Sequence, residues 1–474
     1  MSLLLAVTLV LASCGGTASP GASTPGEAVA TATAAASESS AAVETASPTA
    51  AASTADAETP AANKKPITIK LWGAAVQGAG DSKKPQEEWL FVQMLREYEK
   101  LTGNVTVEFS VIPDQTAVHQ TIKASAMAKN GPDIVNLWAG TYVSSLSEVL
   151  LPLNEYMPQG DLDAFIGWNM LTDNLKLPSE GGKVLGYPIG GLEVGILEYN
   201  NEIIKKAGLD FENDPPKTVA AFLDACEKIK NAGFQPIVSN DGGYNGAVSF
   251  TFNKWWSQQE GLQRLTSNGN QTTKFADDKG FLNLFSTLQT IYKKGYLNQD
   301  YITNADPGFD FYNGKAAMFP TGNWDIEGAK GYLGDKLRIL SLPDFSAEVK
   351  QPGFEAGGVG QSLCVLNYTE NAQECVNLMS WINNRENSIK LGKHVSKFPV
   401  RKDLKLSDFG WENDVVYKTV FELGQKAETW HEFAMDPVLV NEYYAQGAPC
   451  ITGKITPEAF AAAMDAKAAE LLAE

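Results

Sequence analysis

The sequence predicts an α/β protein with two lobes joined by a hinge, and three observations lead to this prediction. Residues 66–138 alternate between strand-like and helix-like stretches. A βαβαβ order of this kind favours a parallel sheet with helices on its faces. Residues 183–200 are rich in β-branched and aromatic residues but are interrupted by glycines, and amphipathic helices follow them. A length of 474 residues is sufficient for a large two-lobed body or for two to three domains.

The stretch KVLGYPIGGLEVGILEYN at 183–200 has the composition of two short strands, 184–189 and 195–199, with a flexible middle. Glycine tolerates large changes of backbone dihedral angles. A strand that leaves one domain through Gly190 and Gly191 and enters another would therefore act as a hinge. Glu193 would then face a cleft between the domains. A plain hairpin with an exposed glutamate fits the same spacing.

The first part of the chain predicts three strands and two helices in alternation. The strands are 66–73, 105–112 and 134–138, and the helices are 86–102 and 119–129. In open α/β sheets, ligands bind beyond the carboxyl ends of the strands. This places Trp72, Asn136 and Trp138 at the edge of a cleft, with packing in the core as the alternative for both tryptophans. Further helices are expected at 201–208, 218–233, 281–294 and 371–392.

The composition argues against several classes of function. A net charge of −18 disfavours a nucleic-acid surface and suits a neutral or cationic ligand. The three histidines are scattered, and neither a zinc motif nor a nucleophile elbow occurs, so no metal, cofactor or catalytic residue is predicted. Two carboxylates would suffice for a glycosidase, and sequence does not exclude such a pair. Four cysteines beyond the N-terminal region allow three complete disulfide pairings: Cys226, Cys364, Cys375 and Cys450.

The N-terminus predicts export. Residues 2–12 form an apolar run that is too short to span a bilayer but suits a secretory signal. Leu11-Ala12-Ser13-Cys14 resembles the bacterial lipobox, which implies cleavage before Cys14 and attachment of a lipid to its sulfur. The run lacks a preceding positive residue, which leaves open a start upstream of Met1, and an ordinary signal peptide with a chance cysteine is the alternative. Residues 14–63 contain mainly Ala, Ser, Thr, Pro and Gly and predict a disordered tether after the signal peptide at 1–13.

Two stretches carry a resemblance to a known family. GYPIGGLEVGILEYN, followed by NEIIKKAGLD, resembles the extracellular solute-binding proteins of ABC importers, in particular the sugar-binding family that includes the maltose-binding proteins. FDFYNGKAAMFPTGNWD at 309–325 resembles a second motif of that family. The resemblance extends from about residue 67 to the C-terminus. It implies a two-lobed periplasmic-binding-protein-like fold with several interlobe crossings, the second of them near 319–322.

The resemblance also implies which residues contact a ligand. Glu193 would hydrogen-bond to sugar hydroxyls, and Asn323, Trp324 and Asp325 would face the cleft from a helix N-terminus. The further candidates come from loops and helices that the family uses in the same order: Tyr244, Trp255, Glu355, Arg401 and Trp430. The alternatives are a helix cap for Asp325, a solvated loop acid for Glu355 and a bracing role for Arg401.

These implications define the expected domains and function. Lobe 1 is expected to comprise residues 64–189 and 322–394, and lobe 2 residues 190–321 and 395–474. The implied function is that of a monomeric, lipid-anchored binding protein, not an enzyme, which captures a carbohydrate at the outer face of the membrane and delivers it to a permease. A surface-tethered carbohydrate-active enzyme and a binding protein for another solute, such as a polyamine, stay open as alternatives.

Overall fold

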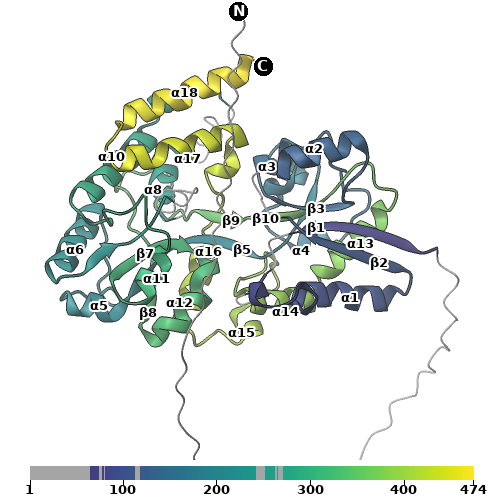
Figure 1. The fold of residues 1–474 in the computed structure, drawn as a ribbon, viewed down its shortest axis with the longest axis horizontal. Coiled ribbons are helices and arrows are strands. Elements are labelled where there is room, and N and C mark those ends of the chain that lie inside the picture. Colours follow the sequence, from purple (N-terminus) through teal and green to yellow (C-terminus); the bar gives the residue numbers. More distant parts are fainter. Residues whose placement is uncertain are drawn as a thin grey trace, which may run out of the picture. The chain divides into compact units, whose positions relative to one another are not determined.

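The computed structural model describes residues 65–473, apart from 74–76, 79–80, 113–117, 242–250, 262–263 and 265–270. Asn63–Glu474 form one compact unit, which contains two β-sheets covered by helices (Figure 1). The predicted signal peptide and tether, with Cys14, lie outside the described residues, as does Tyr244. We call each sheet with its covering helices a lobe.

The first lobe contains a sheet with the strand order β2-β1-β3-β10-β4. β1 is parallel to both β2 and β3, as predicted, and β10 is antiparallel to β3 and β4. The strands are β1 (Ile67–Gly73), β2 (Val105–Val111), β3 (Ile134–Trp138), β4 (Gly186–Pro188) and β10 (Gln361–Val365). The helices of this part of the chain are α1 (Leu90–Thr102), α2 (Val118–Ala128), α3 (Thr141–Ser144), α4 (Asp161–Ala164), α13 (Ala372–Ile382), α14 (Arg385–Val395) and α15 (Leu406–Phe409).

Alternation along β1 explains how this sheet is covered on both faces. Ile69 and Leu71 point into a core that includes Leu95 of α1 and Val376 of α13. Trp72 points to the other face, against the cluster that contains Ile122 of α2. Residues 371–392 were expected to form one helix, but the chain breaks between α13 and α14, where the Asn384 side chain accepts a hydrogen bond from the Asn387 amide and begins a new helix.

The second lobe contains a sheet with the strand order β6-β7-β5-β8. Its strands are β5 (Leu192–Asn200), β6 (Gln235–Ile237), β7 (Ala316–Gly322) and β8 (Leu337–Leu340), and β5 is antiparallel to both β7 and β8. Its helices are α5 (Asn201–Lys206), α6 (Val219–Asn231), α8 (Asn253–Glu260), α10 (Lys279–Lys293), α11 (Pro307–Tyr312), α12 (Ile326–Leu333), α16 (Val415–Gly424), α17 (Pro437–Ile451) and α18 (Pro457–Ala473).

The two lobes are joined first through Gly190 and Gly191. β4 and β5 belong to different sheets, so the hairpin alternative is wrong and the chain crosses between lobes here. Both glycines have positive φ angles, 75° and 86°. A Cβ atom on Gly191 would also lie 2.8 Å from the Phe398 carbonyl oxygen, so both conformation and space require glycine there.

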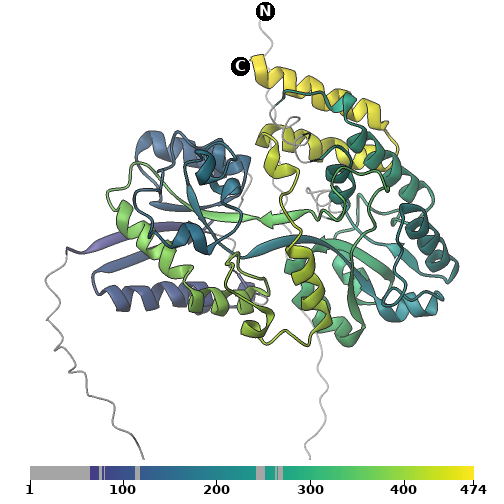
Figure 2. The same ribbon diagram turned by 180° about the vertical axis from the view of Figure 1, so that it is seen from behind.

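The second crossing lies later in the chain than predicted. The expected return at 319–322 is wrong, because β8 follows β7 in the same sheet. The chain returns through β9 (Gly357–Val359), which pairs with β5, and then through β10 of the first sheet. β5 and β9 lie side by side between the lobes in both views (Figure 1, Figure 2). β5 pairs with β7 on one edge and with β8 on the other, so the chain from β7 to β8, residues 323–340, belongs to the second lobe.

The third crossing also differs from the expected position at 395. Phe398 and Phe409 pack together, and α15, which contains Phe409, packs against α14 of the first lobe. The chain joins the second lobe only with α16, which packs against β5 and β8.

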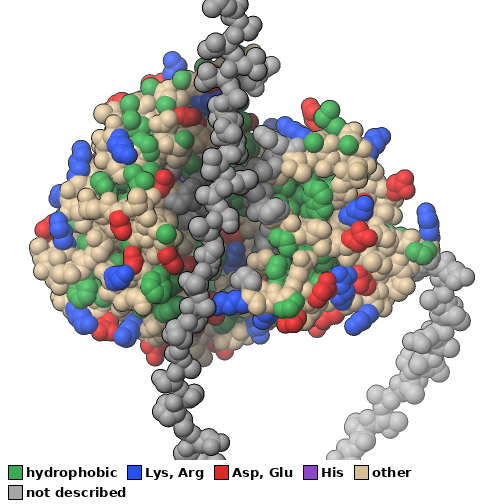
Figure 3. Space-filling model, in the orientation of Figure 1, with side chains coloured by type: hydrophobic (Ala, Val, Ile, Leu, Met, Phe, Trp, Pro, Cys, Tyr) green, Lys and Arg blue, Asp and Glu red, His purple; other side chains and the backbone are tan. Residues whose placement is uncertain are grey.

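The four cysteines named above are buried free thiols, so none of the three pairings is formed. In the described residues no helix is long and apolar enough to cross a membrane. Acidic and basic side chains are interspersed on the face shown in Figure 3.

Candidate functional site

A cavity of about 410 Å³ lies where the crossing segments meet. Both sheets contribute to it: Trp138 ends β3 of the first lobe, and Trp324 lies in the turn after β7 of the second lobe. The residues that line it are Trp138, Glu193, Trp324, Gln361, Lys397, Trp430, Glu432, Phe433 and Tyr444. A volume of this size suits a small organic ligand.

The polar part of the cavity is centred on Glu193 of the first crossing. Its Oε1 atom accepts a hydrogen bond of 2.7 Å from Lys397 Nζ and one of 3.3 Å from Gln361 Nε2. The side chains of Lys397 and Glu193 are only 8% and 11% exposed. A Cβ atom on Gly360 would lie 2.1 Å from Glu193 Oε2, so the absence of a side chain at Gly360 makes room for the carboxylate.

Aromatic rings form the apolar part of the cavity. The rings of Trp324 and Trp430 lie 6.3 Å apart at 43°, and Trp324 is 38% exposed. Lys397 Nζ lies 5.6 Å from the centre of the Trp324 ring. On the first lobe, Trp138 packs edge-on against Tyr142, with ring centres 5.1 Å apart. Such rings offer flat apolar faces on which the carbon face of a sugar ring stacks.

Glu432 adds a second carboxylate to the lining. Tyr444 donates its hydroxyl to Glu432 Oε1 at 3.2 Å, and Asn253 Nδ2 lies 3.5 Å from Oε2. His431 Nδ1 lies 3.1 Å from the same Oε2. Burial lowers the pKa of His431 well below its usual value, so this imidazole is neutral at physiological pH.

Four of the predicted site residues line the cavity together: Trp138, Glu193, Trp324 and Trp430. They come from four different segments of the chain, and the crossing strands bring them into one place. Their role as ligand contacts stays a prediction. Apart from Tyr244, which lies outside the described residues, the remaining predicted residues have other positions.

Asn323 and Asp325 flank Trp324 but point away from the cavity lining. Asn323 accepts a hydrogen bond from the Val194 amide at 3.0 Å and donates one to the Leu192 carbonyl at 2.9 Å. It therefore holds β5 beside Trp324.

Asp325 lies in a buried cluster with Tyr312 and Glu198. Its Oδ1 atom accepts a 2.5 Å hydrogen bond from the Tyr312 hydroxyl, and Glu198 lies beside it. Burial raises the pKa of Asp325 and that of Glu198 above their ordinary values. These contacts hold Asp325 away from the cavity, and its side chain makes no cap hydrogen bond at the start of α12.

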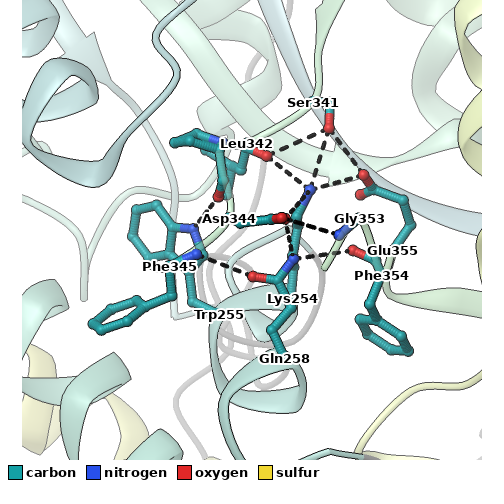
Figure 4. A network of polar contacts seen from close by, with 11 residues as sticks. Lys254, Trp255, Gln258, Ser341, Leu342, Asp344, Phe345, Gly353, Phe354 and Glu355 are labelled. Atoms are coloured by element: carbon teal, nitrogen blue, oxygen red, sulfur yellow. Dashed lines mark hydrogen bonds and ion pairs between the residues drawn. The ribbon is translucent and has the colours of Figure 1, made fainter. Parts of the chain in front are cut away.

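Trp255 and Glu355 belong to a buried polar network on the second lobe (Figure 4). Trp255 donates its indole N–H to the Pro343 carbonyl at 2.9 Å, and Glu355 pairs with Lys254 at 2.8 Å. Neither residue lines the cavity. Each side chain has a partner inside the lobe, and a ligand contact by either residue stays a prediction.

The last three predicted residues also lie outside the cavity lining. Arg401 donates to both carboxylate oxygens of Asp403, at 2.9 and 3.0 Å. This contact braces the chain, which is the alternative interpretation given above for Arg401. Asn136 donates to the Ser362 carbonyl at 3.0 Å between two strands. Trp72 packs in the core, again as in the alternative reading.

Five lining residues were not predicted: Gln361, Lys397, Glu432, Phe433 and Tyr444. Gln361 lies directly opposite Trp138 in the β3–β10 ladder, and this pairing is invisible in the sequence. Lys397 lies four residues before the predicted Arg401, and Glu432 and Phe433 lie shortly after Trp430. Their proximity to predicted residues was the only local signal.

The fold and the cleft between its lobes are those of a solute-binding protein, and the comparison with known families agrees. A family described as bacterial extracellular solute-binding protein matches residues 93–419. The chain belongs to this family.

Among the described residues, no group of His, Cys, Asp or Glu side chains is placed to hold a metal ion.

Individual relatives are similar to the chain over part of its length. The sn-glycerol-3-phosphate-binding periplasmic protein UgpB of Pectobacterium atrosepticum is 24% identical over 290 residues, which cover 58% of this chain and 62% of that protein. The UgpB protein of Brucella abortus (strain 2308) is 30% identical over 151 residues, 30% of this chain and 34% of that protein. The chain therefore matches less than two thirds of the length of either relative.

Solved structures share the fold over most of the chain. A chitin oligosaccharide binding protein has a TM-score of 0.72 and 20% identity, and the match covers 86% of this chain and 100% of that one. The GacH receptor of Streptomyces glaucescens GLA.O, described both unliganded and in complex with acarbose, has a TM-score of 0.65 and 18% identity over 87% of this chain and 100% of that one. At these identities the likeness establishes the fold.

Proposed function

We propose that this protein is the substrate-binding component of an ABC importer and that it captures a carbohydrate in the cavity between its lobes. The observation that carries the proposal is the combination in one cavity of three tryptophan rings with hydrogen-bonding groups of Glu193, Gln361 and Glu432. Sugars present both an apolar face for stacking and hydroxyls for hydrogen bonds. The GacH receptor and the chitin oligosaccharide binding protein, by their descriptions, bind ligands of this class.

The proposed mechanism is closure of the lobes on the ligand. Trp138 and Trp324 belong to different lobes, and Glu193 lies on the first crossing segment beside Lys397 of the segment after α14. A ligand that contacts these residues binds more tightly to the closed arrangement than to the open one and shifts the equilibrium towards it. The closed form then docks on a membrane permease and releases the sugar, and the protein itself performs no reaction.

The proposed location is the outer face of the cell membrane. Cleavage of residues 1–13 would leave Cys14 as the lipid-bearing N-terminus, and residues 14–63 would tether the monomeric binding unit to the membrane. Mass spectrometry of the membrane fraction should find the mature N-terminal peptide carrying acyl chains on Cys14. A Cys14→Ser variant should yield no acylated peptide, and a mature wild-type N-terminal peptide without acyl chains would contradict the lipid anchor.

The test of carbohydrate binding is tryptophan fluorescence during titration with a panel of neutral oligosaccharides, followed by analysis of the mixtures for hydrolysis products. We expect a saturable change and no products. Trp324→Leu should weaken binding about two- to tenfold, since stacking on an aromatic ring contributes about 0.5–1.5 kcal/mol. The matched control is Trp89→Leu, because Trp89 lies outside the cavity and donates to the Lys84 carbonyl at 3.3 Å.

Three results would contradict the proposal. Hydrolysis would identify a carbohydrate-active enzyme, and saturation by a polyamine alone would identify a binding protein for a cation. Equal weakening by Trp324→Leu and Trp89→Leu would show that the cavity is not the binding site.

A further inference from the structure

The charges in the cavity are few and strongly paired. Its lining contains two carboxylates, Glu193 and Glu432, and Lys397 is the one Lys or Arg among the described residues that line it. The internal segments outside the described residues contain no Lys, Arg or His in the sequence, and their one carboxylate side chain is that of Asp114. The sequence therefore holds no further cation in those segments for the cavity.

The charge of Lys397 is already compensated. Its Nζ atom lies 2.7 Å from Glu193 Oε1, and both side chains are nearly inaccessible to water. Gln361 donates to the same oxygen and fixes the carboxylate from a third segment. Buried charge pairs at this distance interact strongly because the surrounding dielectric constant is low.

An anionic ligand in this cavity would meet two carboxylates and a lysine that is not available to it. Charge-assisted hydrogen bonds from Arg or Lys are the strong contacts by which desolvated sites bind phosphate or carboxylate, and they need a cation that is not already paired. A neutral sugar has no such requirement, because its hydroxyls donate to carboxylates and accept from the Gln361 amide.

We infer that Glu193 sets the charge class of the ligand: by neutralising Lys397 it restricts the cavity to saccharides without phosphate, sulfate or carboxylate groups. The inference rests on the proposed function in taking this cavity as the ligand site. It separates the chain from the UgpB relatives, whose name specifies an sn-glycerol 3-phosphate ligand. Glu193 is thus a specificity-determining residue that acts through Lys397.

The experiment is calorimetric titration of the full chain and its Glu193→Gln variant with inorganic phosphate, sn-glycerol 3-phosphate and a uronic-acid oligosaccharide with its neutral counterpart. Wild type should bind the neutral oligosaccharide and none of the anions. The variant should gain affinity for the anions by at least about tenfold, since a hydrogen bond to a charged group is worth on the order of 1.5–3 kcal/mol. The double variant Glu193→Gln/Lys397→Met should lose this gain.

Glu355→Gln is the matched control. Glu355 pairs with Lys254 at 2.8 Å, and these side chains are 5% and 4% exposed, so the same substitution frees an equally buried lysine away from the cavity. The control should gain no anion affinity. A gain equal to that of Glu193→Gln would overturn the inference, as would the lack of any gain in a folded Glu193→Gln variant judged by circular dichroism.

The wild-type comparison decides the matter if the variant does not fold. Binding of the uronic-acid oligosaccharide as tight as that of its neutral counterpart, or saturable binding of sn-glycerol 3-phosphate, would overturn the inference. Failure of the proposed function gives a different pattern. If no saccharide binds to wild type but Glu193→Gln gains phosphate, the charge inference stands and the carbohydrate assignment falls.

Discussion

Lys254→Met should cost about 3–5 kcal/mol of the free energy of unfolding at neutral pH, because it removes one half of a buried ion pair. Lys254 Nζ donates to Glu355 Oε1 at 2.8 Å, to the Leu342 carbonyl at 2.7 Å and to Ser341 Oγ at 3.3 Å, which uses all three ammonium protons (Figure 4). The pair joins α8 to the segment that leads into β9, so it fixes the approach to the second crossing.

The double variant Lys254→Met/Glu355→Leu should recover part of this loss. Both charges are then absent, and two apolar side chains of similar size replace them. The Leu342 carbonyl keeps only the 3.4 Å contact from Ser341 Oγ. A weakly satisfied buried acceptor costs about 1–3 kcal/mol, so the double variant should lie within that range of wild type.

The cost of Lys254→Met should also increase with pH. Burial raises the pKa of Glu355, and Lys254 opposes this rise. In Lys254→Met the pKa of Glu355 in the folded state rises further. Above the ordinary value of 4.5, the folded variant therefore keeps a proton on Glu355 that the unfolded chain has released. Stability is then lost as pH rises above that value. Urea unfolding followed by circular dichroism at pH 5 and pH 8 measures both effects. A cost below about 1 kcal/mol at pH 8, or a cost that shrinks between pH 5 and pH 8, would refute the reasoning.

Three further predictions concern the hinge, the buried acids and the thiols. Gly191→Ala should lower the midpoint of thermal unfolding more than Gly353→Ala. Both glycines have positive φ, at 86° and 71°, but only at Gly191 would a Cβ atom meet another residue. Equal shifts of the two midpoints would contradict this. Glu198→Gln should flatten the fall in stability above pH 4.5, because the raised pKa of buried Glu198 makes wild type lose stability as pH rises; urea midpoints from pH 5 to pH 9 that stay parallel would contradict it. The four buried cysteines should react with a thiol reagent only after denaturation, and reaction in the native protein would show that they are accessible.

The sequence predicted those parts of the fold that depend on neighbouring residues. The strands near residues 67–73, 105–111 and 134–138 follow from local hydrophobic pattern, and the structure confirms them. The crossover at Gly190 and Gly191 follows from glycine between two strand-like runs. The later crossings were misplaced because the pairing of β5 with both β7 and β8 joins residues more than a hundred positions apart, which no local pattern encodes.

The same distinction explains the site. Glu193 and Trp324 were found because each lies in a conspicuous motif. Lys397 was missed because its meaning depends on a partner 204 residues earlier in the chain. The position of Glu355 depends in the same way on a distant residue. Its partner Lys254 lies 101 residues away and holds it inside the lobe. An isolated acidic residue in a loop does not reveal whether it meets a lysine or a ligand.

The position of the Glu193–Lys397 pair connects the site to the hinge directly. Glu193 lies two residues after Gly191, and Leu192 between them donates its amide to the Phe398 carbonyl at 2.6 Å. Glu193 therefore lies on the first crossing segment with Lys397 beside it, whereas Trp138 and Trp324 belong to the separate lobes. Because the pair lies close to these glycines, a rotation of the lobes about them would change the distance between the two rings more than the distance within the pair. A ligand held by the pair gains or loses stacking contacts as the lobes rotate, which is the differential affinity that closure requires.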